Sequence, residues 1–345
     1  MDLSHRPMRA SDIAPCVALV RADPIVGPRY SPVIELLPSV WARLLGQESF
    51  QAVVFCTSDR KSTRVIGARF STFVTDDFMR RLKTAPMVWI GPELVQRVSQ
   101  GRSPLLSDQE VAKANSICDG LNMVVLAGTF DRTYLPKLLD VYNKGYVSVL
   151  ERSSGFCVKE FITQAESEEH LQAVLNTGHL LLCDQEKRYV EPRADQIRNL
   201  LHEPHIIGIT RNLVAQRLGA WVNQMFQYKQ PYLHLNRGQQ RLLLAAMNGA
   251  TDIELAAQLN VSEAAIKKRW RDIYDRVHDR VPELFSAEES PESSSKRGKA
   301  KKHRLLSYVR EHPEELRPFA RKAVTVSPGT AITTATKSRV ANAAI

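Results

Sequence analysis

The chain has 345 residues, of which 43% are hydrophobic, 24% charged and 7% aromatic. This length predicts two domains, and the ordinary composition excludes a short peptide and a chain that is disordered throughout. The 47 Lys and Arg exceed the 37 Asp and Glu, giving a net charge of +10 that favours a polyanionic partner or a membrane surface. Residues 231–345 hold 20 of these cations and 13 of these anions, so most of the excess lies in the last third of the chain.

The sequence indicates a cytoplasmic protein without a membrane partner. The start, Met1 to Arg6, lacks the apolar segment of a signal peptide, and no apolar run approaches the roughly 20 residues of a membrane helix. The cysteines lie far apart with no paired spacing, which predicts buried thiols and neither a disulfide framework nor a zinc site. These cysteines are Cys16, Cys56, Cys118, Cys157 and Cys183.

The first 228 residues mix helical and strand patterns. Residues 12–46 have helical spacing interrupted at Pro24, Gly27 and Pro28, which predicts two helices joined by a proline-rich loop. Residues 51–56 and 65–74 are apolar runs around a polar turn and predict a β-hairpin.

Further strands are expected at residues 122–126 and 146–150, with a helical pattern between them, and helical periodicity dominates from Arg211 to Phe226. We therefore expect an α+β domain over residues 1–228, with a mixed sheet and helices. His202 and His205 have a spacing found in metal sites, but Pro204 between them favours a loop.

Three short helices are predicted between Leu235 and Val277. The first ends at Asn248-Gly249, residues that tolerate a left-handed C-cap. Thr251 and Glu254 form a capping box that opens the second helix. Asn260-Val261 makes the turn, and Ser262 caps the third helix.

The third helix has two chemically different faces. Lys267, Lys268 and Arg271 fall on one side together with Ala264, whose small side chain allows close approach to a partner. Asp275 would repel phosphate and should lie outside a groove. The opposite side is apolar and is formed by Ile266, Trp270, Ile273 and Val277. This pattern is typical of a recognition helix that enters the major groove by its N-terminal half, with Trp270 in the core.

These residues resemble the LuxR-type helix-turn-helix. The similarity is carried by Gly249, Thr251, Glu254-Leu255-Ala256, Leu259, Val261-Ser262, Ile266-Lys267 and Ile273. It implies an all-α DNA-binding domain over residues 231–282, with double-stranded DNA as the partner. The implied DNA-binding residues are Thr251, Ser262, Ala264, Lys267, Lys268 and Arg271. The sequence departs from the family where Thr-Pro-Arg-Glu is replaced by Asn236-Arg237-Gly238-Gln239, and where Ala265 and Arg269 replace a Thr and a His.

The N-terminal domain resembles the GNAT acyltransferase fold in residues 65–70, which are similar to its hairpin, and 142–146, which are similar to its Tyr-x-x-x-Gly-Phe/Tyr segment. That resemblance implies acyl-CoA as a cofactor. The glycine-rich loop that holds the pyrophosphate is not found, since Ala127-Gly128-Thr129 after the strand supplies only one glycine. We therefore name no catalytic residue, no metal and no cofactor, with acyl-CoA kept as the alternative, and we leave open whether this domain is an enzyme, favouring that it is not.

The end of the chain changes in composition. Residues 286–302 predict a charged flexible linker, 303–323 a helical extension split at Pro313, and 324–345 a disordered tail. A cation cluster near the linker fits either a solvated charge run or non-specific DNA contacts. It consists of Lys296, Arg297, Lys299, Lys301, Lys302 and Arg304.

The sequence therefore predicts a sequence-specific transcriptional regulator whose N-terminal domain senses a small-molecule ligand or mediates assembly. One alternative is an N-acyltransferase tethered to DNA, and another is a helix-turn-helix used as a protein interface. A homodimer is expected, because one small domain with about three cationic contacts cannot reach the roughly 10⁻⁸ M affinity of specific regulators. The apolar residues of 305–319 are expected to dock within or between protomers.

Overall fold

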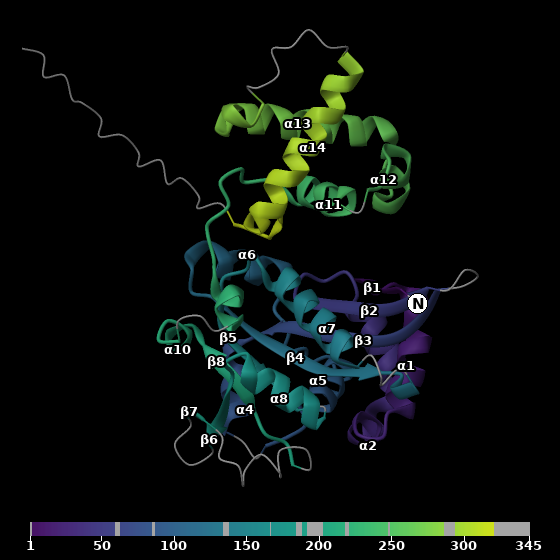
Figure 1. The fold of residues 1–345 in the computed structure, drawn as a ribbon, viewed down its shortest axis with the longest axis vertical. Helices are drawn as coiled ribbons and strands as arrows, with labels where there is room; N and C mark the ends of the chain where they lie inside the picture. Colours follow the sequence, from purple (N-terminus) through teal and green to yellow (C-terminus); the bar gives the residue numbers. More distant parts are fainter. Residues whose placement is uncertain are drawn as a thin grey trace, which may run out of the picture.

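A computed structural model describes residues 2–58, 63–84, 87–133, 138–165, 167–183, 188–191, 203–217, 221–247, 249–285 and 294–320. The chain forms a mixed α/β unit followed by a smaller helical unit, which Figure 1 shows above the sheet. None of the helices in these ranges is long and apolar enough to cross a membrane.

The described part of the α/β unit contains one eight-stranded mixed sheet in the order β1-β2-β3-β4-β5-β8-β6-β7. Its strands are β1 (Asp2–Pro7), β2 (Phe50–Ser58), β3 (Thr63–Val74), β4 (Leu121–Phe130), β5 (Val158–Thr163), β6 (Leu180–Cys183), β7 (Arg188–Val190) and β8 (Ile207–Thr210). The β4–β5 pair is parallel and its ladder ends at Val124 and Ile162, whereas β4 continues to Phe130 beside β3. The strands β4 and β5 therefore diverge at the centre of the sheet.

Helices cover both faces of this sheet because successive strand residues point to opposite sides. Val124 faces a core formed with α1 (Ile13–Ala22), α2 (Val26–Tyr30), α3 (Leu37–Leu44), α4 (Asp76–Thr84) and α5 (Ile90–Ser99). Met123 faces a second core formed with α6 (Asp108–Ile117), α7 (Leu138–Ser153), α10 (Arg211–Val214) and the 3-10 helix η4 (Trp221–Phe226). Helix α8 (Glu168–Asn176) packs with β6 and β8 through Leu171, Leu181 and Ile207.

Several elements differ from their sequence-based predictions. The proline-rich loop of 24–28 is partly helical, since Gly27 and Pro28 lie in the first turn of α2, where proline is tolerated. Residues 142–146 and 146–150 lie inside α7, so the second strand prediction is wrong: a short apolar run on a packed helix has the same composition as a strand. Ala127-Gly128-Thr129 belongs to β4 instead of following it. The helical pattern of 211–226 is divided between α10 and η4.

The cysteines also differ from expectation at one position. Cys16, Cys56 and Cys157 are buried thiols as predicted, but Cys118, the residue that ends α6, is exposed. None of these four forms a disulfide. The side chain of Cys183, the imidazole of His202 and the tail 324–345 lie outside the described residues.

The helical unit is built from α11 (Arg237–Ala246), α12 (Asp252–Leu259), α13 (Glu263–Arg280) and α14 (Ser294–Glu311), with short 3-10 helices η5 (Pro282–Leu284) and η7 (Pro313–Leu316). Leu305, Val309 and Leu316 join the core of α11 to α13, so the apolar residues of the extension dock within the protomer. Helix α14 begins inside the predicted linker 286–302, since the docked half of the helix supports regular structure in the charged half.

A C-terminal segment, residues 312–320, joins the two units. The carboxylate of Glu315 accepts hydrogen bonds from the backbone N–H of Tyr232 (2.6 Å) and Leu233 (2.9 Å) at the start of the helical unit. Asn115 of α6 donates to the carbonyl of Pro318 (2.9 Å), and Arg317 donates to the carbonyl of Ser154 (2.8 Å). The segment therefore bonds to both units.

An ion pair fastens the edge of the sheet to the first helix. Arg6 of β1 donates two hydrogen bonds to Asp12, of 2.6 and 2.8 Å, and the N–H of Arg9 donates a third of 2.8 Å. The Asp12 side chain is 7% exposed. The hydrogen bond from Arg6 holds the pKa of Asp12 below its ordinary value of 3.8.

We predict that Asp12→Asn lowers the free energy of unfolding at pH 7 by about 2 kcal/mol, because charge-assisted hydrogen bonds contribute roughly 1.5–3 kcal/mol. The pKa of Asp12 is depressed in the folded state, so its contribution is present above pH 3.8 and is lost as the pH falls through the folded-state pKa. Urea unfolding at pH 7 and pH 3 should show the difference from the parent shrinking in acid. Asp77→Asn, in an exposed pair with Arg80, should change stability by less than about 0.5 kcal/mol. An equal deficit at both pH values would contradict the prediction.

Candidate nucleic-acid interface

Each of the three helices of the candidate interface starts with a side-chain cap. Thr251 accepts from the N–H of Glu254 (3.4 Å), whose carboxylate in turn accepts from the N–H of Thr251 (2.7 Å). Ser262 accepts from the N–H of Ala265 (3.2 Å). Helix α11 has an equivalent box made by Asn236 and Gln239. Asn236 and Gln239, which differ from the LuxR-type sequence at this place, therefore still cap the helix through their side-chain amides.

The turn between α12 and α13 depends on Asn260. This residue ends α12 in the left-handed conformation, with φ of 50°, which asparagine tolerates better than most side chains. The next N–H, of Val261, donates to the carbonyl of Ala256 (3.0 Å). The chain can then reverse within two residues, and Ser262 opens α13 directly.

Helix α13 presents the two faces that its spacing predicts. Ile266, Ile273 and Val277 are fully buried, and Trp270 is 5% exposed against the same core. The side chains of Ala264, Lys267, Lys268 and Arg271 are exposed on the other side. The structure thus brings four of the six predicted DNA-binding residues onto one surface, while Thr251 and Ser262 act as caps at the starts of the two helices.

Charge is divided along the exposed side of α13. Its N-terminal half carries Lys267, Lys268 and Arg271, and its C-terminal half carries exposed Asp272 and Asp275. A polyanion is attracted to the first half and repelled by the second. Only the N-terminal half is suited to a phosphate-lined groove.

Helix α14 lies beside this surface. Lys299 and Lys302 of α14 line a groove of about 400 Å³ with Lys267 and Arg271 of α13. Lys302 is held 3.3 Å from a carboxylate oxygen of Asp252 and 4.8 Å from the ring centre of Trp270. Of the remaining cluster, Lys301 sits over the ring of Phe285, Arg304 is half-buried, and the side chains of Lys296 and Arg297 lie outside the described residues.

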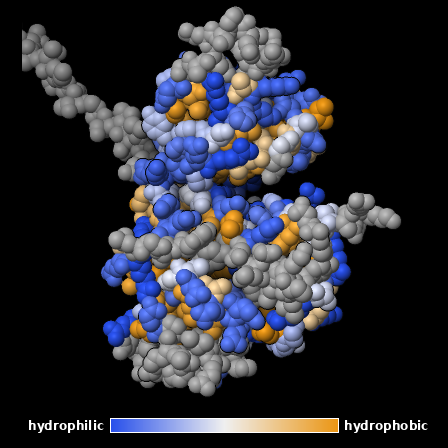
Figure 2. Space-filling model, in the orientation of Figure 1, coloured by the Kyte–Doolittle hydropathy of each residue, from blue (hydrophilic) through white to orange (hydrophobic). Residues whose placement is uncertain are grey.

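The α/β unit does not obstruct the cationic side of α13. In Figure 1, α11 and the C-terminal segment lie between the sheet and α13, so α13 is on the side of the helical unit away from the sheet. On the face shown in Figure 2, the surface of the helical unit is mostly hydrophilic. The groove at Lys267 and Arg271 is lined by residues of the helical unit alone.

The opening between β4 and β5 is filled. Arg29 lies over the ring of Trp89, 3.7 Å from its centre, and both line a cavity with Tyr30, Val125 and Gln164. About 10 Å³ is left, roughly the volume of one water probe. Among the described residues, no three His, Cys, Asp or Glu side chains come together as a metal site.

Sequence reasoning missed a group of arginines at the junction of the two units. Arg237 and Arg241 of α11 line one cavity with Arg276 of α13. The i, i+4 spacing of Arg237 and Arg241 places them on one helix face, and this was the available signal. The sequence around Arg276 carries no signal that places this residue near α11.

Comparisons with known proteins gave no match, neither to a model of a protein family, nor to a curated protein, nor to a solved structure. The function is therefore inferred from the chemistry of the surface described above.

Proposed function

We propose that this protein is a sequence-specific DNA-binding transcriptional regulator with a LuxR-type helix-turn-helix, in which α13 enters the major groove by its N-terminal half. The observation that carries this proposal is the single exposed face of Lys267, Lys268 and Arg271 on a helix whose opposite side is fixed in the core. A helix held in this way can place cations against both base edges and phosphates.

Neighbouring groups add to the same surface. Thr251 caps the start of α12, the positive end of that helix dipole, where Asp252 and Glu254 carry the opposite charge. Lys299 and Lys302 extend the cations of α13 sideways through the shared groove. These lysines supply attraction that does not depend on base sequence, whereas the exposed end of α13 supplies the readout.

For the α/β unit we propose a GNAT-like fold that senses a ligand or mediates assembly. The mixed sheet and the β2–β3 hairpin support this fold, whereas the segment 142–146 lies within α7 and does not add to it. The alternative of a tethered acyltransferase is weakened by two features. Ala127-Gly128-Thr129 lies within β4, with an irregularity in the pairing to β3 at Ala127 and Gly128, rather than in a loop at a strand-to-helix junction, and Arg29, Tyr30 and Trp89 fill the space beside Val125 and Gln164.

The remaining alternative, a helix-turn-helix that binds protein, differs in its dependence on salt. Release of counterions from DNA makes affinity fall steeply as salt rises, while an apolar protein interface responds weakly. The exposed face of α13 is cationic rather than apolar, and this favours DNA.

We predict that the triple variant Lys267→Ala, Lys268→Ala, Arg271→Ala folds normally and binds DNA much more weakly. Each lost phosphate contact should flatten the plot of log affinity against log salt by about one unit of slope. Gel-shift selection from random DNA would first supply the operator, and titrations at several salt concentrations would follow.

The matched control changes three exposed arginines of the α/β unit, Arg21, Arg80 and Arg102, to alanine and so removes the same charge far from α13. This control should keep the parental slope. A triple α13 variant that binds as the parent does would refute the assignment of α13 as the recognition helix.

We predict no acyl transfer at enzymatic rates. Because the sequence that follows β4 has no glycine-rich pyrophosphate loop and Arg29, Tyr30 and Trp89 fill the neighbouring space, acetyl-CoA offered with a panel of amines should give no saturable turnover in the usual range of about 1–1,000 s⁻¹. Release of free coenzyme A is the measurement. Turnover in that range would replace the sensor with the tethered acyltransferase, whereas saturable binding without turnover is the behaviour of a sensor.

We predict that two copies of the full chain bind one operator, on half-sites about 10 base pairs apart, because three cationic contacts per copy are too few for specific affinity. Sedimentation of the protein with and without the selected operator measures the stoichiometry. A single copy bound at saturation would rule out the dimer.

A further inference from the structure

An open cavity of about 640 Å³ lies at the junction between the two units. It is lined by α6 of the α/β unit, by the start of the helical unit, by α13 and by the C-terminal segment. A volume of this size lies within the roughly 300–1,000 Å³ of small-molecule sites. The cavity is therefore formed only when both units and the C-terminal segment are in place.

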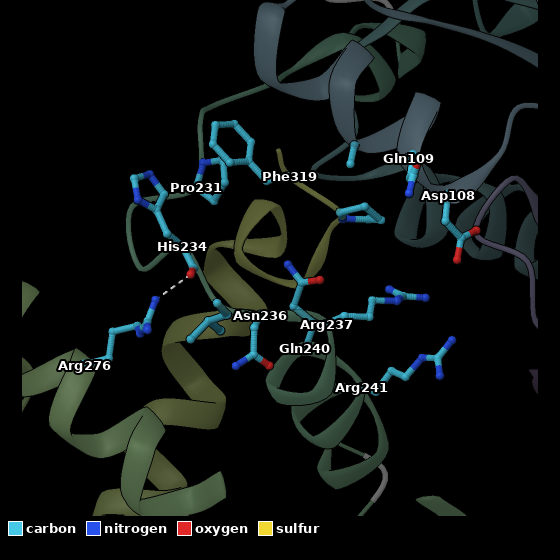
Figure 3. Close-up of a pocket in the computed structure, with 13 residues that line it drawn as sticks. Asp108, Gln109, Pro231, His234, Asn236, Arg237, Gln240, Arg241, Arg276 and Phe319 are labelled. Carbon is cyan, nitrogen blue, oxygen red and sulfur yellow. Dashed lines mark hydrogen bonds between the residues drawn. The ribbon is translucent and has the colours of Figure 1, made fainter. Parts of the chain in front are cut away.

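One end of the cavity is cationic. Figure 3 shows Arg237 and Arg241 extending together from α11 toward Asp108 of α6. Arg237 pairs with Glu48 through Nη2, but its Nε and Nη1 atoms are buried without a hydrogen-bond partner among the described residues. Burial, and next the charge of Arg241, lower the pKa of Arg237 to about 10. The local positive charge is therefore incompletely balanced.

The other end presents aromatic rings beside the guanidinium of Arg276. Phe319 of the C-terminal segment stacks on His234, with ring centres 5.5 Å apart and planes 7° from parallel. Pro318 and Leu235 line the same cavity. His234 has a left-handed backbone, with φ of 50°, and Arg276 holds its carbonyl through a 2.7 Å hydrogen bond. The aromatic pair is thus held in place from the helical unit.

The geometry points to a binding site for a small anionic molecule with a flat apolar body, its anionic group between Arg237 and Arg241 and its ring against Phe319. Arginine forks suit carboxylate and phosphate groups, and a buried donor without a partner is satisfied by the oxygen of such a group. Asp108 and the Glu48 partner of Arg237 limit the positive charge, which favours one anionic group over a polyanion such as nucleic acid. The site does not depend on the proposed DNA-binding function.

The test uses the full-length protein and three probes in buffer of constant ionic strength. Inorganic phosphate presents the anionic group alone, phenol the ring alone, and phenyl phosphate both. Calorimetry should show saturable binding of phenyl phosphate, at least about tenfold tighter than phosphate, and no saturable binding of phenol. Arg241→Gln should weaken phenyl phosphate by about tenfold, as expected for the loss of one charge-assisted pair. Arg102→Gln, an exposed arginine outside the cavity, should leave its affinity unchanged.

A second variant tests the site by gain of affinity. Gln109 is exposed at the α6 side of the cavity, so Gln109→Arg should fold normally and tighten phenyl phosphate severalfold. Absence of saturable binding to the parent, or equal affinities in the Arg241→Gln, Gln109→Arg and Arg102→Gln variants, would overturn the proposal. Because no DNA is present, this failure is distinct from a failure of the proposed function.

Discussion

The buried carboxylate of Glu315 is the interaction on which the relation between the two units depends. It is 1% exposed and accepts from the N–H groups of Tyr232 and Leu233, where the chain enters the helical unit. Burial raises the pKa of this carboxyl, while the two backbone donors favour its charged form. Replacing the acceptor would leave two backbone donors without a partner in a site that excludes water. A buried donor without a partner costs more free energy than one hydrogen bond contributes, so substitutions at such a contact are poorly tolerated. The C-terminal segment is consequently part of the fold of the helical unit.

The same segment continues directly onto the α/β unit. Asn115 is 1% exposed, donates to the carbonyl of Pro318, and accepts from the N–H of Cys157 through its side-chain oxygen. A displacement of the segment would therefore disturb α6 and the start of β5 together with the entry to α11. The α/β unit is bonded to the helical unit through the C-terminal segment and through the pair of Arg237 in α11 with Glu48, whereas α13 is buried against α11 and α12 and touches the sheet through none of these bonds. Coupling between a sensed ligand and DNA would act on the placement of the whole helical unit rather than on the shape of α13.

The sequence was sufficient wherever the determinant is local. Capping boxes, a left-handed asparagine and the spacing of apolar residues each operate within a turn or two, so α12, α13 and their faces follow from residues 251–277 alone. The β2–β3 hairpin is predictable for the same reason. The prediction of a strand at residues 146–150 was wrong because a short apolar run on a packed helix shows no periodicity that distinguishes it from a strand. The sequence did not predict the helical start of α14, because the composition there favours a solvated chain. Docking of Leu305 and Val309 outweighs that preference. The arginine cavity and the Glu315 contact join residues more than 80 positions apart, and no pattern in one sequence pairs them.

The excess charge of the last third of the chain is also organised by tertiary packing. On the sequence, the lysines of α13 and those before residue 305 are separate clusters, and each alone is compatible with a solvated surface. Packing of α14 against the core brings Lys299 and Lys302 into a common groove with Lys267 and Arg271. Asp252 and Trp270 hold Lys302 in that place, so a carboxylate that would repel phosphate is engaged by a cation instead. A cationic surface assembled from two helices spans more of a phosphate backbone than either helix alone, and Coulomb attraction between neighbouring charges and one polyanion is cumulative. The proposed DNA interface therefore includes residues of α14 as well as those of α13.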